Sequence, residues 1–242
     1  MGFKMPETKP ANEKTEVCRV WQLAIDVDMV LRGQGADPAK VRLRQPRLVE
    51  LAGRAITLGT KWMQPLVAYR AVDIQEVPSG KVILENGAEL KGYGISRRLK
   101  GLESVISAIA TLGPTFEREF LAATNEDLAL GLALDGFGTA AIGALTSAAG
   151  KYFTQHLTAK HSLTTGPLFP GMRGWDLAGA QTALFSLVDA SSIGVSLNSS
   201  FVMQPSKSVS LVIGIGQKAR CTELPCNECD SSEICRHKPS TT

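Results

Sequence analysis

Apolar residues recur at helical spacing in the first third of the chain. Steps of three and four residues after Pro46 place them on one side of an α-helix. Proline lacks the amide hydrogen that a helix interior needs, so Pro46 must end or restart a helix at that point. Asp37 followed by Pro38 predicts an earlier helix start, with Asp37 as the N-cap. The apolar positions after Pro46 are Leu48, Leu51, Ala55, Leu58 and Trp62.

The middle and the last part of the chain carry strand patterns. Residues 78–80 (Pro-Ser-Gly) predict a turn, and Asn86-Gly87 is a dipeptide that favours the tight turn of a β-hairpin. The uncharged run 104–112 ends at Gly113-Pro114 and predicts a central, buried strand. The expected strands span residues 66–77, 81–84, 104–112, 193–197 and 208–215.

A long apolar segment, residues 128–149, has the length of a membrane span, which needs roughly 20 apolar residues. Its many small residues make it weakly hydrophobic, and a charge such as Asp135 at a bilayer centre costs about 2.5–3.5 kcal/mol. We therefore expect no membrane span but a buried helix, capped by Asn125 and extending to about His161, whose glycines let neighbouring backbone approach. A further helix is expected after the N-cap Asp176.

This order of elements contains no repeated strand–helix–strand unit and predicts an α+β fold. We expect three parts: an N-terminal tail (1–16), a folded domain (17–217) and a cysteine-rich tail (218–242). The composition, 44% apolar and 20% charged, is that of a globular protein.

Charge excludes some function classes. A net charge of +3 does not suggest a nucleic-acid partner, and the basic residues Arg97, Arg98 and Lys100 are interpreted as a solvated helix face. Residues 1–16 are polar and contain no apolar leader, so we expect a cytoplasmic protein whose thiols are reduced.

Four of the five cysteines lie close together near the C-terminus, in the spacing Cys221-x4-Cys226-x2-Cys229-x5-Cys235. Four thiolates suit either a [4Fe–4S] cluster or tetrahedral zinc. The spacing predicts a metal centre, with an iron–sulfur cluster favoured and zinc as the alternative; His237 also permits a site of three cysteines and one histidine. Disulfides and free thiols are the competing interpretations, and reduced thiols argue against the first.

Ordered motifs give the chain a resemblance to a known family. They include Pro170-Gly171-Met172-Arg173-Gly174-Trp175-Asp176 and the run 193–205 (IGVSLNSSFVMQP), with Val30-Leu31-Arg32-Gly33 and residues 65–70 (PLVAYR) upstream. These motifs resemble the activation domain of cobalamin-dependent methionine synthase and, more closely, free-standing relatives of that domain in anaerobes. The resemblance covers about residues 17–217.

The resemblance implies a twisted antiparallel sheet with flanking helices. It also implies a role in the reactivation of an inactive corrinoid. In the family, the domain binds S-adenosylmethionine beside cob(II)alamin, which is reduced to cob(I)alamin before remethylation. The family motif Arg-x-x-Pro-Gly-Tyr here begins with Pro167 and ends with Met172, and its Thr-Glu-Ser is Asn198-Ser199-Ser200. An arginine guanidinium binds a carboxylate with two parallel hydrogen bonds, and proline has no side-chain donor to replace them. We therefore expect adenosylmethionine to bind weakly or not at all.

These inferences together predict an accessory protein of a corrinoid-dependent methyltransferase system. It would dock on a corrinoid protein or methyltransferase and reduce cob(II)alamin through a cluster held by the four tail cysteines. The alternative is a non-catalytic corrinoid-binding or scaffolding module with structural zinc. Met172, Trp175, Phe201 and Met203 would face the corrin ring or lie in the core, and the spacing identifies no catalytic residue. The predicted cofactor-binding residues are Pro170, Gly171, Met172, Trp175, Ser200 and Met203.

Overall fold

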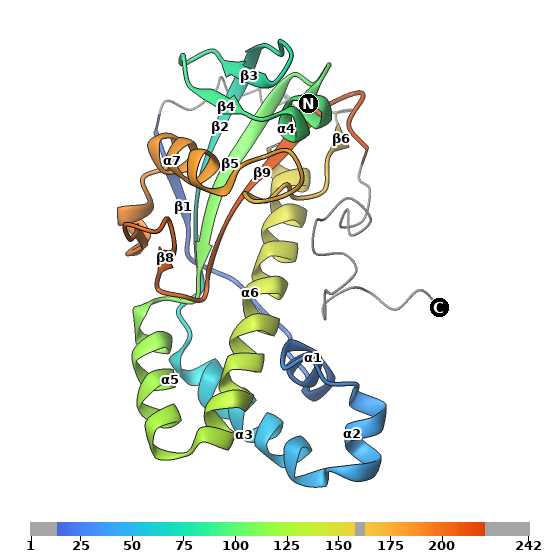
Figure 1. Ribbon diagram of the computed structural model, residues 1–242, viewed down its shortest axis with the longest axis vertical. Helices are drawn as coiled ribbons and strands as arrows, with labels where there is room; N and C mark the ends of the chain where they lie inside the picture. Colours follow the sequence, from blue (N-terminus) through green and yellow to red (C-terminus); the bar gives the residue numbers. More distant parts are fainter. Residues whose placement is uncertain (1–13, 158–162, 221–242) are drawn as a thin grey trace, which may run out of the picture.

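The computed structural model describes residues 14–157 and 163–220 and contains one large antiparallel sheet (Figure 1). Its hydrogen-bonded order is β4-β3-β2-β5-β9-β6. The strand β1 pairs with the first part of β2, and β3 pairs with the last part of the same strand. The strands are β1 (Glu16–Cys18), β2 (Leu66–Glu76), β3 (Lys81–Leu84), β4 (Glu89–Lys91), β5 (Ser104–Thr111), β6 (Leu163–Thr164) and β9 (Ser208–Gly216).

The strand β5 is the centre of the sheet. It pairs with β2 from Leu66↔Thr111 to Asp73↔Ser104, and with β9 from Ser104↔Ile215 to Thr111↔Ser208. All its residues after Ser104 are buried, as the uncharged run predicted. Because side chains alternate between the faces of a strand, Ile106 and Ala108 pack into one apolar cluster and Val105 and Ile109 into another.

Helices cover the two sides of the sheet differently. Four of them gather at one end of the molecule, and α6 runs from that group along one face of the sheet (Figure 1). The other face packs against α7 and α4. The helices are α1 (Val27–Gly33), α2 (Pro38–Arg44), α3 (Pro46–Trp62), α4 (Tyr93–Leu99), α5 (Pro114–Glu126), α6 (Leu128–His156) and α7 (Leu177–Leu187).

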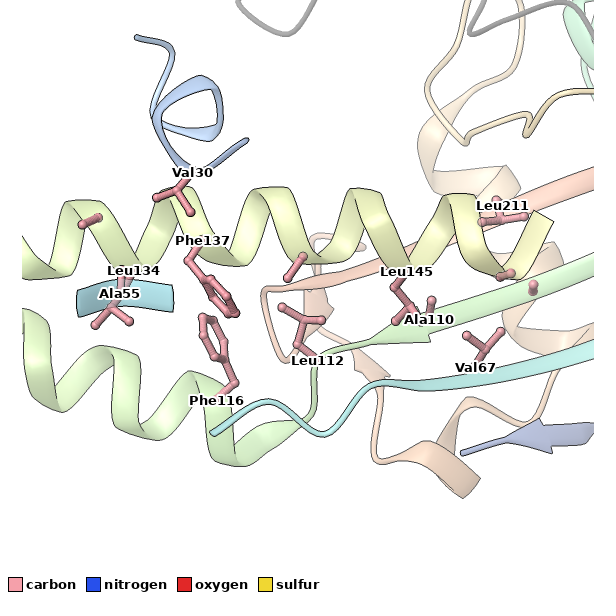
Figure 2. Packing of buried hydrophobic residues seen from close by; sticks show 14 of the residues in the cluster. Val30, Ala55, Val67, Ala110, Leu112, Phe116, Leu134, Phe137, Leu145 and Leu211 are labelled. Carbon is pink, nitrogen blue, oxygen red and sulfur yellow. The ribbon is translucent and has the colours of Figure 1, made fainter. Parts of the chain in front are cut away.

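The long helix α6 is the core of the helical group. Phe137 of α6 points towards Phe116 of α5, with ring centroids 5.8 Å apart, and Leu145 lies over the sheet (Figure 2). The helix is long and apolar enough for a membrane span, but half of the residues in its most apolar stretch are buried inside this fold. The expectation of a buried helix is therefore confirmed.

Glycines set how closely α1 and α6 approach each other. A Cβ added to Gly136 would lie 2.6 Å from the carbonyl oxygen of Val30, and one added to Gly33 would lie 2.3 Å from the oxygen of Gly136. Contacts this short are not seen for real side chains, so only glycine fits at both positions. Gly143 of the same helix is exposed, and a Cβ there would meet nothing within 4 Å.

Several sequence predictions are confirmed in detail. Asp37 caps α2 by accepting a hydrogen bond from the amide of Ala39 (3.0 Å), and Pro46 is the first residue of α3. Asp176 caps α7 through the amide of Gly179 (2.7 Å).

Three boundaries were predicted wrongly. Asn125 lies inside α5, and the cap of α6 is Asp127, whose carboxylate accepts from the amides of Ala129 and Leu130. The helix ends at His156, before the expected 161. Residues 193–197 are only partly a strand, because Asp189 caps a 3-10 helix, η1 (Ala190–Ile193), which ends at the left-handed Gly194 and leaves two residues for β7 (Ser196–Leu197).

Candidate functional site

The first predicted segment, residues 170–175, forms a tight turn between α4 and α7. The turn is closed by hydrogen bonds from the amide of Gly171 to the carbonyl of Trp175 (3.0 Å) and from the amide of Trp175 to Met172 (2.8 Å). It is tied to α4 by a bond from the amide of Gly94 to the carbonyl of Gly174 (2.8 Å). The turn therefore has a fixed conformation and a fixed place against α4.

Only part of this turn reaches the surface. Gly171 is exposed, and Pro170 and Met172 are half-buried. Trp175 is only 1% exposed and packs in the cluster between the sheet and α7. Of the two positions expected for Trp175, against a corrin ring or in the core, the structure shows the second, so its ring is not presented at the surface. Leu177 adds an exposed apolar side chain next to Gly171.

The second predicted segment is a short hairpin of β7 and β8 (Met203–Gln204). Its tip is shaped by Asn198, whose side-chain oxygen accepts from the amides of Ser200 (2.9 Å) and Val202 (3.0 Å). Phe201 and Val202 are 37% and 52% exposed, while Met203 is half-buried against the core. The hairpin thus carries two apolar side chains at the surface.

The structure does not bring these two segments together. The turn contacts α4, which leads into the start of β5, whereas Ser206, just after β8, donates its amide to Glu117 of α5 (2.8 Å), and α5 follows the end of β5. The eight residues of β5 span roughly 25 Å. Figure 1 shows α4 and α5 at opposite ends of the sheet. The two segments, predicted to form a pocket or a docking wall, therefore lie towards opposite ends of β5.

The four predicted metal ligands, Cys221, Cys226, Cys229 and Cys235, lie outside the described residues. The chain approaches them from β9 through a turn in which the amide of Ala219 donates to Gly216 (3.0 Å). Within residues 14–157 and 163–220, no group of three or more metal-binding side chains is found, and Cys18 is a free thiol. The metal centre at the tail stays a prediction.

A cavity of about 270 Å³ lies where the chain leaves β9. It is formed by the end of α4 and the following loop, by residues 165–168, and by the turn after β9. Its position, near Pro167 and next to Cys221 in the chain, was not predicted. Five of its lining side chains are cationic: Arg97, Arg98, Lys100, Lys218 and Arg220.

Backbone hydrogen bonds fix the frame of this cavity. Thr165 donates its amide to Gly214 of β9 (2.9 Å) and accepts from the same residue through its hydroxyl (3.0 Å). Glu103 donates its amide to Ile215 (2.9 Å) from the other side of β9. The three segments that carry the cations are thus held by the sheet.

A cluster of aromatic side chains joins β1, β2 and α6 at another place. The hydroxyl of Tyr69 donates to the carboxylate of Glu16 (2.8 Å), and the ring of Tyr152 contacts both Tyr69 and Trp21. Burial raises the pKa of Tyr69 far above its usual value, and the Glu16 carboxylate adds to this rise. Tyr69 stays protonated, and the cluster is explained as packing that secures β1.

Comparison with known proteins supports the architecture. No protein-family model and no curated protein matches the chain. Among solved structures, it is similar to the one titled "Crystal Structure of the MetH Reactivation Domain bound to AdoHcy", with a TM-score of 0.55 and 11% sequence identity, over 92% of this chain and 86% of that one. The fold, an α+β domain with a curled antiparallel sheet and flanking helices, is that of the MetH reactivation domain, as predicted.

Proposed function

We propose that this chain is an accessory protein that docks on a corrinoid protein or corrinoid-dependent methyltransferase and returns cob(II)alamin to cob(I)alamin. The observation that carries the proposal is the similarity to the MetH reactivation domain over 92% of the chain. The sequence motifs and the similar fold together support two parts of this proposal. One is that the partner carries cobalamin, and the other is that this chain is a free-standing, anaerobe-type relative of the domain.

The docking surface is proposed at the turn 170–175 and the start of α7. Met172 and Leu177 offer apolar contact area there, on a turn that α4 holds in place. This surface lies at the same end of the sheet as Arg220, the residue before Cys221. Ser200 and Met203 lie towards the other end, and they remain predicted contacts for a partner large enough to span both.

The electron source is proposed in the tail, at Cys221, Cys226, Cys229 and Cys235. Four thiolates are the donor set of a [4Fe–4S] cluster, whose potential can reach about −700 mV. Carboxylates near a cluster favour its oxidised form and so lower the potential, which is the direction that reduction of cob(II)alamin requires. The acidic residues close to these cysteines in the sequence are Glu223, Glu228, Asp230 and Glu233.

We further propose that S-adenosylmethionine binds weakly or not at all, although the similar solved domain is bound to AdoHcy. Pro167 stands where the family motif has arginine, and losing a charge-assisted contact weakens binding about tenfold to hundredfold. Calorimetry that detects micromolar binding of adenosylmethionine to the purified chain would contradict this part of the proposal.

Docking can be tested without any electron transfer. A protein that binds the form of cob(II)alamin without its lower axial ligand more tightly must shift the corrinoid towards that form. Adding the wild-type chain to cob(II)alamin should therefore change its visible absorption spectrum. Met172→Ala with Leu177→Ala should remove the change. The matched pair Leu43→Ala with Leu132→Ala, which truncates exposed apolar side chains of α2 and α6 outside both predicted segments, should retain it.

The tail is tested separately by metal analysis of anaerobically purified protein. Iron with labile sulfide and a broad visible shoulder supports the reductive role. Stoichiometric zinc without iron would contradict the reductive role and support the alternative, a corrinoid-binding or scaffolding module with a structural metal. If the wild type never changes a corrinoid spectrum, the docking proposal fails whatever the metal is.

A further inference from the structure

The group of helices at one end of the molecule exposes several leucines. Leu43 of α2 is 85% exposed and Leu128 of α6 is 67% exposed, and Leu121 of α5 and Leu132 of α6 are also more than half exposed. Leu128 and Leu132 are four residues apart and therefore lie on the same face of their helix. Single exposed leucines are common on protein surfaces, but four in one group of helices indicate a candidate interaction surface.

Charges at this end of the molecule are separated by sign. Residues 38–49, which form α2 and the start of α3, contain four cations and no carboxylate. Residues 114–127, which form α5 and the cap of α6, contain four carboxylates and one arginine. Figure 1 shows α2 and α5 on opposite sides of α3. The helical end therefore has a basic side at α2 and an acidic side at α5.

Local ion pairs neutralise only half of the basic side. Lys40 and Arg42 are paired with nearby carboxylates. Arg44 and Arg47 are exposed and form no ion pair within the described part of the chain. Glu50, one helical turn after Arg47, is exposed and pairs with neither of them. Two cations are thus left uncompensated beside Leu43.

The acidic side keeps a matching excess. Glu119 and Asp127 are paired with arginines. Glu126 is exposed and forms no ion pair among residues 14–157 and 163–220. Glu117 accepts a hydrogen bond from a backbone amide (2.8 Å) but, within the same ranges, has no cationic partner. Two carboxylates near the exposed leucines of α5 and α6 therefore remain available to cations from outside the molecule.

We propose that this end of the molecule binds a second copy of the chain in a two-fold symmetric dimer. In such a dimer both protomers use the same surface, so the basic side of each copy lies against the acidic side of its partner and the contact is made twice. A nucleic acid or an anionic membrane would be attracted by the basic side but repelled by the acidic side, whereas a second copy complements both.

The helix α3 sets the spacing between the two sides. Arg47 lies in its first turn, and Arg54, whose guanidinium is 4.0 Å from the carboxylate of Asp127, follows seven residues later, or roughly 10 Å along the helix. A two-fold axis that crosses α3 between them, near Glu50, would make α3 antiparallel to its copy. Arg47 would then lie opposite the partner's Glu126, with exposed leucines on either side of this contact.

The proposed interface is independent of the corrinoid proposal. It lies at the helical end of the molecule, whereas the turn 170–175 is held by α4 at the opposite end of the sheet (Figure 1). Each protomer of the dimer would keep that turn free, and a monomeric variant should still change a corrinoid spectrum as the wild type does.

Light scattering coupled to size-exclusion chromatography of the full chain tests the dimer. At low salt, where screening of surface charges is weak, the mass should be twice the 25.8 kDa of one chain. Arg44→Glu with Arg47→Glu should give a monomer, and Glu126→Arg alone should do the same, because like charges then face each other. Circular dichroism confirms that each variant is folded.

Mixing the two monomeric variants gives the sharpest result. In a mixed dimer, the reversed basic side of one chain meets the reversed acidic side of the other, and the second contact keeps its native charges. The mixture should therefore return to the mass of a dimer, although neither variant dimerises alone. The control Arg19→Glu with Lys151→Glu makes the same charge change at exposed positions away from α2, α3 and α5 and should stay dimeric.

Apolar contact is tested by a separate variant. Leu43→Ser with Leu128→Ser should raise the dissociation constant of the dimer about tenfold or more, as measured by sedimentation at several protein concentrations, because each dimer loses four buried leucines.

Four results would overturn the proposal. One is a wild-type chain that stays monomeric at about 100 μM, a concentration at which micromolar dimers are assembled. Another is a series of larger assemblies, which a closed two-fold contact does not allow. The third is a charge-reversal pair that remains monomeric after mixing. The fourth is equal loss of the dimer in the control, which would mean that net charge and not this surface governs association.

Discussion

The close crossing of α1 and α6 gives a stability prediction with an internal control. Replacing glycine by alanine in a helix interior stabilises the helix by about 0.5–1 kcal/mol. At Gly143 nothing opposes this gain, because an added Cβ meets no atom within 4 Å. At Gly136 the Cβ would lie 2.6 Å from a carbonyl oxygen of α1 and 2.5 Å from the Cγ of Gln34. Backbone cannot rotate away as a side chain can, so α1 has to shift.

Overpacking of this kind costs typically about 1–3 kcal/mol. Since the helix preference is the same at both positions, it cancels in the comparison, and Gly136→Ala should be less stable than Gly143→Ala by this packing cost. Urea unfolding followed by circular dichroism measures both free energies, and each kcal/mol also shifts the melting temperature by about 2–4 °C in a chain of this length. If both variants gain equal stability, α1 does not lie against Gly136.

Three further predictions address the cap of α6, the buried tyrosine and the tail. Asp127→Ala should cost about 1 kcal/mol of unfolding free energy, whereas Asn125→Ala should leave it almost unchanged, since Asn125 is exposed inside α5; equal losses would mean that the cap is misassigned. Stability should fall as the pH rises above about 10, because the unfolded chain then releases a proton that folded Tyr69 retains, and Tyr69→Phe should reduce this slope in unfolding curves at about pH 9 to 11; an unchanged slope speaks against a raised pKa. Cys226→Ser with Cys229→Ser should remove the bound metal or chromophore while the circular dichroism of the domain stays the same, and full iron and sulfide in this variant would exclude both residues as ligands.

The sheet was readable from the sequence because its signals are local. An uncharged run bounded by Gly113-Pro114 identified β5, and Asn86-Gly87 identified the turn between β3 and β4. The helix boundary at Asp127 was missed because Asn125 and Asp127 are both good capping residues. Only the continuation of α5 through Glu126 decides between them.

The proposed site was harder to predict because it depends on contacts between distant segments. Trp175 lies in a polar, glycine-rich stretch that suggests exposure, yet its ring is buried where the turn packs against Gly92 and Gly94. In the same way, Lys218 and Arg220 share a cavity with α4 only because β9 pairs with β5. Motif order in a sequence does not show which face, or which end of a sheet, a residue occupies.

The most direct test of the proposed function is a single-turnover reduction of cobalt. The wild-type chain is reduced with titanium(III) citrate, freed of excess reductant and mixed anaerobically with cob(II)alamin. Each reduced cluster should give one electron to one cobalt, so the cob(II) absorption band should disappear as the cob(I) band forms and the cluster returns to its oxidised spectrum. The chain with Cys226→Ser and Cys229→Ser should still change the cob(II) spectrum but should form no cob(I). Equal reduction by both chains, or no reduction by an iron-loaded wild type, would contradict the proposed function.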